Sequence, residues 1–361
     1  MSIASAPVRV LVVDDSAVMR QLLSTVLSAD ADIEVVGTAS DPHIARERIK
    51  ALNPDVVTLD VEMPHMDGLT FLRKIMTLRP TPVVMVSTLT QAGAEVTLEA
   101  LEAGAVDFVA KPADLAGIKD TFAAELQGKV KAAARTRVGA RRAIPVQVAQ
   151  PQRRIRRAAE RVVVIGASTG GVEALKIVLM GIPADCPPIL ITQHMPPRFT
   201  AAFAQRLDRE CPMRVFEASH DQPIEPGHVY IAPGSHHLRL ERHSGRDRCV
   251  ISDEAPVSGH RPSVDVLFRS AARIAGAAAI GVILTGMGKD GAEGLLELRK
   301  AGAITLGQDE ESSLIYGMPR AAFERGAVMH QYPLDRIAGA ILDACESDSR
   351  AHPARHSHDA A

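Results

Sequence analysis

The sequence predicts an α/β protein of two domains, each built on a doubly wound, mainly parallel sheet. Three observations support this prediction. The chain has 361 residues, of which 46% are hydrophobic, which is enough for more than one buried core. Short β-branched runs alternate with helical periods in two separate blocks of the chain. A polar stretch rich in arginine separates the blocks and predicts a linker.

The first block, residues 8–126, contains five apolar runs, each followed by a helical period. The strands are predicted at RVLVVDD, IEVVGTA, VVTLDVEM, PVVMVST and VDFVAKP. The helices are predicted over Val18–Leu27, Ile44–Leu52, Leu69–Leu78 and Val96–Glu102, with a last helical stretch after the fifth strand. This alternation is typical of a parallel sheet, in which functional residues gather at the carboxyl ends of the strands.

The second block, residues 161–346, repeats the pattern and adds shorter strands. Its strands are predicted at RVVVIGA, PILITQH, HVYIAPG, LRLER, CVISD, AAIGVILTG and AITLGQD, and its helices over Thr200–Leu207, Val264–Ala275 and Ala292–Lys300. LRLER and CVISD indicate an antiparallel hairpin. Residues 1–7 form an extension, residues 127–160 a basic flexible linker that is partly helical at its start, and residues 347–361 a disordered, His-containing tail.

Composition excludes several classes of protein. The net charge of −2 gives no overall field that would attract nucleic acid or an anionic membrane, and 3% aromatic residues leave few surfaces for base stacking. The chain shows no secretory leader and no apolar run of about 20 residues, so we expect a cytoplasmic protein with no membrane insertion. The four cysteines are scattered, which predicts reduced thiols instead of disulfides or a zinc site.

Charged and hydroxyl side chains end the strands of the first block. Asp14 and Asp15 follow the first strand, Asp60 ends the third, Ser87 ends the fourth and Lys111 follows the fifth. Crowded carboxylates repel one another unless a cation lies among them, and Mg²⁺ prefers such oxygen ligands. One carboxylate then acts as the nucleophile toward a phosphoryl donor. Asp60, alone at its strand end, is the best candidate, although a single such Asp is often only a helix cap.

The segments LVVDDSAVMR, TLDVEMPHMDGL, VVMVSTLT and DFVAKP resemble the receiver domain of two-component response regulators, which has a flavodoxin-like (βα)5 fold. The resemblance implies phosphorylation of Asp60 by a histidine kinase. It also implies that Asp14, Asp15 and Asp60 bind Mg²⁺, and that Lys111 contacts the phosphoryl group. Ser87 and Phe108 match the hydroxyl and aromatic positions that reorient on phosphorylation.

The second block carries a possible Ser–His–Asp triad. Ser168 stands in the Gly-rich turn GASTGG after the first strand, where a sharp turn exposes a nucleophile at a helix N-terminus. His194 ends the next apolar strand and is the candidate base. Asp290, in the loop TGMGKDG, is the candidate carboxylate that orients the histidine.

Two alternatives remain at this point. The strand, Gly-rich turn and helix around Ser168 also suit dinucleotide binding, although GxSxGG is not GxGxxG and no acidic residue follows at the expected distance. Asp290 also fits the N-cap of the helix over Ala292–Lys300.

The segments IGASTGG, QHMPPRFTAAFAQRL and ILTGMGKDGAEGL resemble the catalytic domain of the chemotaxis protein-glutamate methylesterases (CheB). The resemblance implies hydrolysis of glutamate γ-methyl esters on methyl-accepting chemotaxis receptors, and deamidation of receptor glutamines in some members. Ser168 is then the nucleophile, His194 the base and then acid, and Asp290 the orienting carboxylate. The backbone N–H groups of Ser168 and Met287 form the oxyanion hole. The resemblance implies no cofactor for the hydrolysis. It also implies that the unphosphorylated receiver inhibits the esterase domain, and we expect the chain to be a monomer.

Two other functional classes compete with this interpretation. Receivers are often fused to DNA-binding domains, and the linker contains RRIRR, but a helix-turn-helix needs far fewer residues than the Gly-rich α/β block that follows. The second competing class is a pure interaction module without catalytic activity, in which the three residues of the triad occur together by coincidence. Methanol release from methylated receptors and a DNA-mobility assay discriminate between the three classes.

Overall fold

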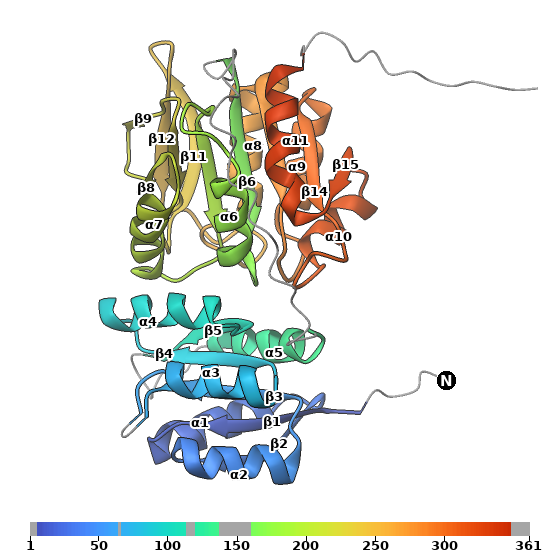
Figure 1. The fold of residues 1–361 in the computed structure, drawn as a ribbon. Helices are drawn as coiled ribbons and strands as arrows, with labels where there is room; N and C mark the ends of the chain where they lie inside the picture. Colours follow the sequence, from blue (N-terminus) through green and yellow to red (C-terminus); the bar gives the residue numbers. More distant parts are fainter. Residues whose placement is uncertain (1–5, 64–65, 113–119, 137–159, 348–361) are drawn as a thin grey trace, which may run out of the picture.

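The structure is a computed structural model that describes residues 6–63, 66–112, 120–136 and 160–347. Most of the predicted extension and linker lie outside these residues, as does the tail after Ser347. Two α/β domains are stacked end to end, with the N-terminal domain at the bottom of Figure 1. The predicted fold class is therefore confirmed.

The N-terminal domain is a five-stranded parallel sheet in the order β2-β1-β3-β4-β5. Its strands are β1 Val8–Val13, β2 Ile33–Ala39, β3 Val56–Asp60, β4 Val83–Ser87 and β5 Asp107–Ala110. Its helices are α1 Ala17–Ser28, α2 Pro42–Leu52, α3 Gly68–Leu78, α4 Gln91–Glu102 and α5 Asp120–Ala134. Buried side chains of α1 and α5 pack on one face of the sheet, and those of α2, α3 and α4 pack on the other.

The C-terminal domain is built on a seven-stranded, wholly parallel sheet in the order β15-β14-β13-β6-β7-β10-β8. Its strands are β6 Val162–Ala167, β7 Ile189–Gln193, β8 Arg214–Glu217, β10 His228–Ile231, β13 Ala279–Ile283, β14 Ile304–Gln308 and β15 His330–Tyr332. The chain passes from β6 to β7 on one side and returns to β13 on the other. The carboxyl ends of these three central strands thus form a topological switch point, the usual place for a site in such sheets.

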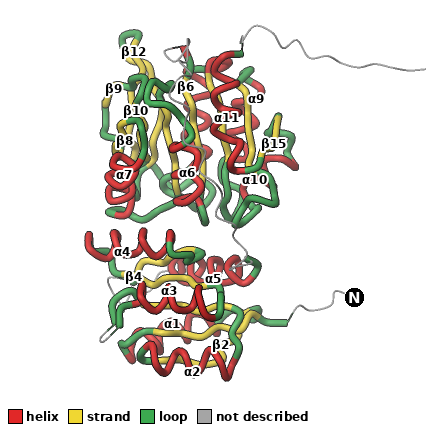
Figure 2. The backbone as a smooth tube through the Cα atoms, viewed as in Figure 1, coloured by secondary structure: helices red, strands yellow, loops and turns green. Residues whose placement is uncertain are grey.

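Helices cover both faces of this sheet, as Figure 2 shows. They are α6 Gly171–Met180, α7 Phe199–Glu210, α8 Val264–Ile274, α9 Ala292–Lys300, α10 Met318–Glu324 and α11 Leu334–Glu346, with a short 3₁₀ helix, η2, at Gly276–Ala278. The apolar sides of α6, α7 and α11 share one core, and those of α8, α9 and α10 share the other. The predicted antiparallel hairpin is β11 His237–His243 with β12 Arg246–Ser252, and β9 Gln222–Pro223 extends it.

Local sequence explains where the first four helices of the receiver begin, since each follows a residue whose side chain accepts a backbone N–H bond. Asp41 and Asp67 accept backbone N–H bonds at the starts of α2 and α3, as expected for N-cap residues.

The predicted boundary between receiver and linker at residue 126 is wrong, because it falls inside α5, which continues to Ala134. The physical reason is burial: Leu126 and Val130 are fully buried in the receiver core, so the last two turns of α5 belong to that domain.

The two domains meet through α4, β5 and α5 of the receiver, which face the lower end of the catalytic domain in Figure 1. The ring of Phe108 in β5 stacks on that of Phe199 in α7, with centroids 4.5 Å apart. Both rings are buried, and one continuous apolar cluster runs through both domains. The receiver therefore lies on the end of the catalytic sheet where the predicted triad residues are found.

Candidate active site

Ser168, His194 and Asp290 follow three neighbouring strands. Ser168 comes directly after β6, His194 directly after β7, and Asp290 lies in the loop after β13. The Gln193 side chain joins the first two strand ends, because its Nε2 donates to the backbone oxygens of Ser168, at 3.0 Å, and His194, at 3.1 Å. A side chain at position 286 would collide with Ser168, since an added Cβ would lie 2.8 Å from the serine Cβ. Gly286 thus lets the β13 loop approach the serine.

The imidazole of His194 meets Asp290 through Nε2, which lies 2.8 Å from the aspartate Oδ2. The other ring nitrogen, Nδ1, is buried and has no hydrogen-bond partner among the described residues. In the serine-protease arrangement the aspartate instead binds Nδ1 and leaves Nε2 for the serine. The roles of the two nitrogens are therefore exchanged in this chain, and Nδ1 is the atom left to accept a proton.

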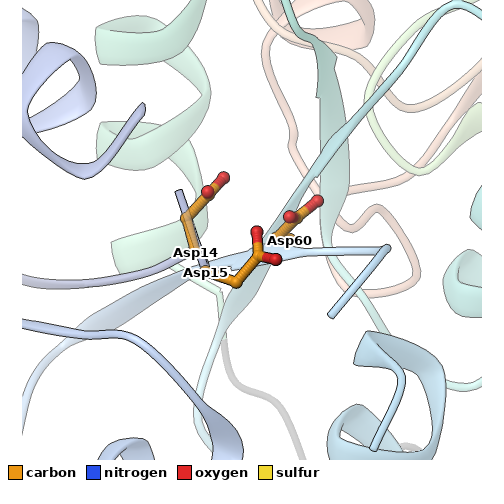
Figure 3. A group of neighbouring side chains, drawn as sticks. All are labelled: Asp14, Asp15 and Asp60. Carbon is orange, nitrogen blue, oxygen red and sulfur yellow. The ribbon is translucent and has the colours of Figure 1, made fainter. Parts of the chain in front are cut away.

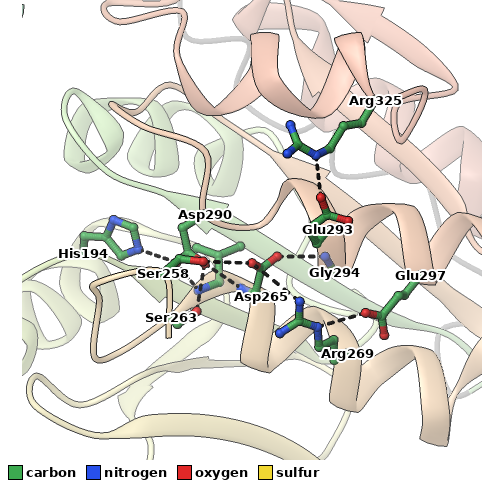
Figure 4. A network of polar contacts seen from close by, with 11 residues as sticks. His194, Ser258, Ser263, Asp265, Arg269, Asp290, Glu293, Gly294, Glu297 and Arg325 are labelled. Atoms are coloured by element: carbon green, nitrogen blue, oxygen red, sulfur yellow. Dashed lines mark hydrogen bonds and ion pairs between the residues drawn. The ribbon is translucent and has the colours of Figure 1, made fainter. Parts of the chain in front are cut away.

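Asp290 is held by a dense network of donors (Figure 4). Besides His194, its carboxylate accepts from the Ser263 hydroxyl at 2.8 Å and from the backbone N–H groups of Val264 and Asp265 at 2.7 and 3.2 Å. Burial alone would raise the pKa of Asp290, but the bond and charge of His194, with those backbone and hydroxyl donors, lower it. The carboxylate is therefore kept ionised beside the imidazole.

The alternative role of Asp290 as the N-cap of α9 is wrong. The residue before α9 is Gly291, and that helix has no side-chain cap. Asp290 instead receives the free N–H groups at the first turn of α8, where the positive end of the helix dipole stabilises a negative charge. A second carboxylate, Asp265, lies in the same turn, and burial together with the charge of Asp290 raises its pKa.

The predicted oxyanion hole needs a correction. The Ser168 N–H already donates to the backbone oxygen of Thr285 at 3.0 Å, a bond between adjacent strand ends, so it does not point into the site. The backbone N–H groups of Thr169 and Met287, by contrast, make no hydrogen bond with another described residue. Met287 was predicted from the sequence, whereas Thr169 was not.

The receiver covers this site directly. The Thr169 hydroxyl, next to the serine, donates to the Asp107 carboxylate of β5. An added Cβ on Gly128 of α5 would lie 2.9 Å from the Met287 methyl group. Ser168 lines a cavity between the domains of about 20 Å³, which is room for little more than one water molecule. The receiver residues Leu101, Asp107 and Phe108 line the same cavity, so the receiver leaves little free volume on that side of the half-buried serine.

Ion pairs fix the receiver around that contact. Glu102 of α4 binds Lys176 of α6 at 2.7 Å and also Arg206 of α7. Within the receiver, Lys129 lies 3.4 Å from Asp107 and donates to the backbone oxygen of Phe108 at 2.6 Å. Burial would lower the pKa of Lys129, but the nearby carboxylates raise it, so it stays charged. Sequence reasoning missed all of these pairs, because they join residues far apart in the chain.

The acidic side chains of the receiver converge as predicted (Figure 3). Carboxylate oxygens of Asp14, Asp15 and Asp60 lie within 4.8 Å of one another. Lys111 Nζ lies 2.8 Å from Asp60 Oδ2 and 3.0 Å from Asp14 Oδ2. Burial, with the charge of Asp14, raises the pKa of Asp60 to about 6 although Lys111 opposes the shift. Three oxygen ligands with poorly compensated charge fit Mg²⁺.

The predicted switch residues lie in the two strands next to β3: Ser87 ends β4 and Phe108 is in β5. The Ser87 hydroxyl donates to the backbone oxygens of Thr88 and Gly93, at 3.4 and 3.3 Å, at the start of α4. Phe108 is 3% exposed and points toward α7 of the other domain. In this state the Ser87 hydroxyl is bound to the α4 region, and Phe108 is part of the domain interface.

Comparison with known proteins agrees with the two-domain division. The family described as CheB methylesterase matches residues 163–341, and the family described as response regulator receiver domain matches residues 10–123. A protein of Caulobacter vibrioides named protein-glutamate methylesterase/protein-glutamine glutaminase 1 is 59% identical over 94% of this chain and 98% of its own length. A similarly named protein of Xanthomonas oryzae pv. oryzae is 56% identical over 93% of this chain and 97% of its own.

A solved structure supports the fold of the second domain. The CheB methylesterase catalytic domain of Thermotoga maritima is 37% identical and covers 51% of this chain and 97% of its own, with a TM-score of 0.50. Among the described residues no helix is both long and apolar enough to cross a bilayer.

Proposed function

Because this chain belongs to the family of CheB methylesterases that carry a response-regulator receiver domain, we propose that it hydrolyses glutamate γ-methyl esters of methyl-accepting chemotaxis receptors under the control of phosphorylation. The names of the relatives also support hydrolysis of glutamine side-chain amides. The observation that carries the proposal is the His194 to Asp290 contact of 2.8 Å at the strand end next to Ser168. It supplies a base and an orienting carboxylate where the sequence places a nucleophile.

The chemistry follows from these positions. The Ser168 Oγ attacks the ester carbonyl while His194 Nδ1 takes the hydroxyl proton. The same proton is then given to the methoxide leaving group, so methanol departs and an acyl-serine remains. Water, deprotonated by His194, attacks the acyl-serine, and the proton returns to Ser168 as the glutamate carboxylate is released. With a glutamine substrate, ammonia leaves in place of methanol.

Asp290 and two backbone N–H groups stabilise the charges that develop. The ionised Asp290 keeps a proton on Nε2 of His194 and stabilises the imidazolium form of that ring. The N–H groups of Thr169 and Met287 have no other partner among the described residues, and we assign the oxyanion hole to them. The N–H of the residue after the nucleophile has this role in other strand–turn–helix hydrolases.

Asp60 is the proposed phosphorylation site, with a histidine kinase as phosphodonor. Asp14, Asp15 and Asp60 would hold Mg²⁺, which would neutralise charge on the incoming phosphoryl group. Lys111, already bound to Asp60, would contact the phosphoryl oxygens. No step of the ester hydrolysis involves a metal ion or a cofactor in this proposal.

The unphosphorylated receiver is proposed to inhibit the esterase by exclusion. The support is the 20 Å³ cavity at Ser168 and the contact of Asp107 with Thr169. Phosphorylation of Asp60 draws the Ser87 hydroxyl toward the phosphoryl group, so the hydrogen bond from Ser87 to the Gly93 backbone oxygen is lost. Phe108 is then free to move away from Phe199. The receiver face that holds the esterase closed is thereby changed. We propose a monomer, since inhibitor and enzyme are both within one chain.

Receptor demethylation measured with and without acetyl phosphate tests this function. Wild-type protein should release methanol from methylated receptor membranes, and more quickly after addition of the phosphodonor and Mg²⁺. Ser168→Ala removes only the nucleophilic oxygen and should lower the rate by about 10³-fold or more while the melting temperature is kept. Wild-type turnover by Ser168→Ala would refute the triad.

A further inference from the structure

The ring of His194 is covered on one face by a second histidine. The ring centroids of His194 and His260 are 3.8 Å apart, and the two planes differ by 8°. The His260 ring makes no hydrogen bond with a described residue, and the stack on His194 is its one aromatic contact among those residues. The triad needs Asp290 at the edge of the His194 ring, but it does not require a second ring stacked on the face of His194.

The backbone around His260 holds its ring in place. Residues 257 and 260 exchange two backbone hydrogen bonds, of 3.0 and 2.9 Å, across a tight turn. Ser258 and Gly259 at the centre of that turn have φ of 53° and 81°, the left-handed values that such a two-residue turn requires. The Ser258 hydroxyl donates to the Asp265 carboxylate at 3.3 Å. The stack is thus built by an ordered loop that is bonded to α8.

The surroundings keep His260 uncharged. Burial, followed by the charge of His194, lowers the pKa of His260 to about 4. Asp290 and Glu125 act in the opposite direction, while Lys129 lowers the pKa further, and together they do not restore it. A neutral aromatic ring presents a negative face to a neighbouring cation. At neutral pH, His260 therefore offers such a face to His194.

We propose that His260 is a positioning residue whose ring face stabilises the imidazolium form of His194 and holds that ring between Asp290 and Ser168. This inference depends on the proposed triad, because His194 becomes a cation only when it takes the Ser168 proton. His260 would thus act through His194, without touching the substrate ester.

Two substitutions separate the ring face from the space that it fills. His260→Phe keeps an aromatic face and removes the ring nitrogens, whereas His260→Leu fills the site without a face. With full-length protein, acetyl phosphate and Mg²⁺, we expect kcat of His260→Phe to stay within about twofold of wild type. We expect kcat of His260→Leu to fall by about 3- to 30-fold with little change in KM.

The pKa of His194 gives a second measurement that does not depend on turnover. Histidine side-chain NMR signals of the full-length protein can be titrated, with His194→Gln used for assignment among the 13 histidines. We expect a lower His194 pKa in His260→Leu than in His260→Phe, because only Phe still stabilises the protonated ring. The acid limb of the kcat profile should move in the same direction.

Other results would overturn the inference. Equal kcat and equal His194 pKa in the Leu and Phe variants would make His260 a space-filling residue. Equal losses in both variants would assign the effect to the ring nitrogens. The Ser168→Ala protein distinguishes a failure of the His260 role from a failure of the triad. If Ser168→Ala is inactive while His260→Leu and His260→Phe behave alike, only the role of His260 fails. If Ser168→Ala is active, the proposed triad fails as well.

Discussion

Thr169, the residue after Ser168, donates its hydroxyl hydrogen bond to Asp107 in the other domain. Asp107 is also 3.4 Å from Lys129 and is followed by Phe108, whose ring is in the domain interface. One short chain of contacts therefore connects the predicted switch aromatic with the turn that carries the nucleophile.

Reversing one interface charge should activate the unphosphorylated enzyme. Glu102→Lys would place a third cation beside Lys176 and Arg206, and such like-charge contacts cost up to several kcal/mol. We expect basal methanol release to rise by about tenfold. The matched control is Glu47→Lys on α2, whose one ion pair with a described residue is to Lys50 of its own helix. An equal effect of both variants would exclude a specific role for the Glu102 contacts.

Removing the phospho-acceptor should abolish the response without raising the basal rate. Asp60→Asn cannot form the acyl phosphate, so the contacts of Phe108 with Phe199 and of Asp107 with Thr169 should remain in place. We expect the demethylation rate to be unaffected by acetyl phosphate and close to that of unphosphorylated wild type. Stimulation of Asp60→Asn to the wild-type level would assign phosphorylation to another residue.

Neutralising the triad carboxylate should remove most of the activity. Asp290→Asn loses the charge that stabilises the His194 imidazolium and favours the wrong ring tautomer, and the corresponding change in a serine protease lowers kcat by about 10⁴-fold. We expect a fall in kcat of about 10³- to 10⁴-fold here. Ser263→Ala, which removes one donor to the same carboxylate, is the control and should cost about 1 kcal/mol of stability with a much smaller loss of kcat.

Acid should destabilise the protein partly through His260. Its folded-state pKa of about 4 lies below the usual value near 6.5. The unfolded chain thus binds the proton more readily, and this contribution to stability is full above about pH 6.5 and is lost as the pH falls toward 4. We expect wild type to lose more free energy of unfolding between pH 7 and pH 4.5 than His260→Phe does.

Denaturant unfolding at the two pH values measures that difference. His43→Phe is the control, because His43 is an exposed residue of α2. If His260→Phe and wild type lose the same stability over this range, the low pKa of His260 is contradicted.

The sequence predicted what depends on local pattern. Alternating apolar runs placed both sheets, and strand ends identified Ser168, His194 and Asp290 because parallel strands bring their carboxyl ends to one edge. The choice of ring nitrogen was not predictable, since it depends on how the β7 and β13 loops approach each other. The α8 cap by Asp290 likewise joins residues that are distant in the chain.

Other misses have the same origin. The family resemblance implies an oxyanion-hole role for the Ser168 N–H, but the neighbouring strand supplies the backbone oxygen of Thr285 as its partner. His260 gave no sequence signal, because a lone histidine before Arg–Pro in a loop is ordinarily a surface residue. Only the fold brings it onto His194.

The position of Phe108 has a consequence for the lifetime of the signal. Because Phe108 must leave Phe199 before the esterase opens, the activation of the receiver and the opening of the esterase are coupled equilibria. Such coupling is reciprocal in free energy. Anything that occupies the open esterase, including the receptor itself, must then favour the activated receiver by the same factor. A phosphoryl mimic should bind the receiver more tightly in the presence of saturating substrate, so that abundant methylated receptor would prolong the signal that removes its methyl groups.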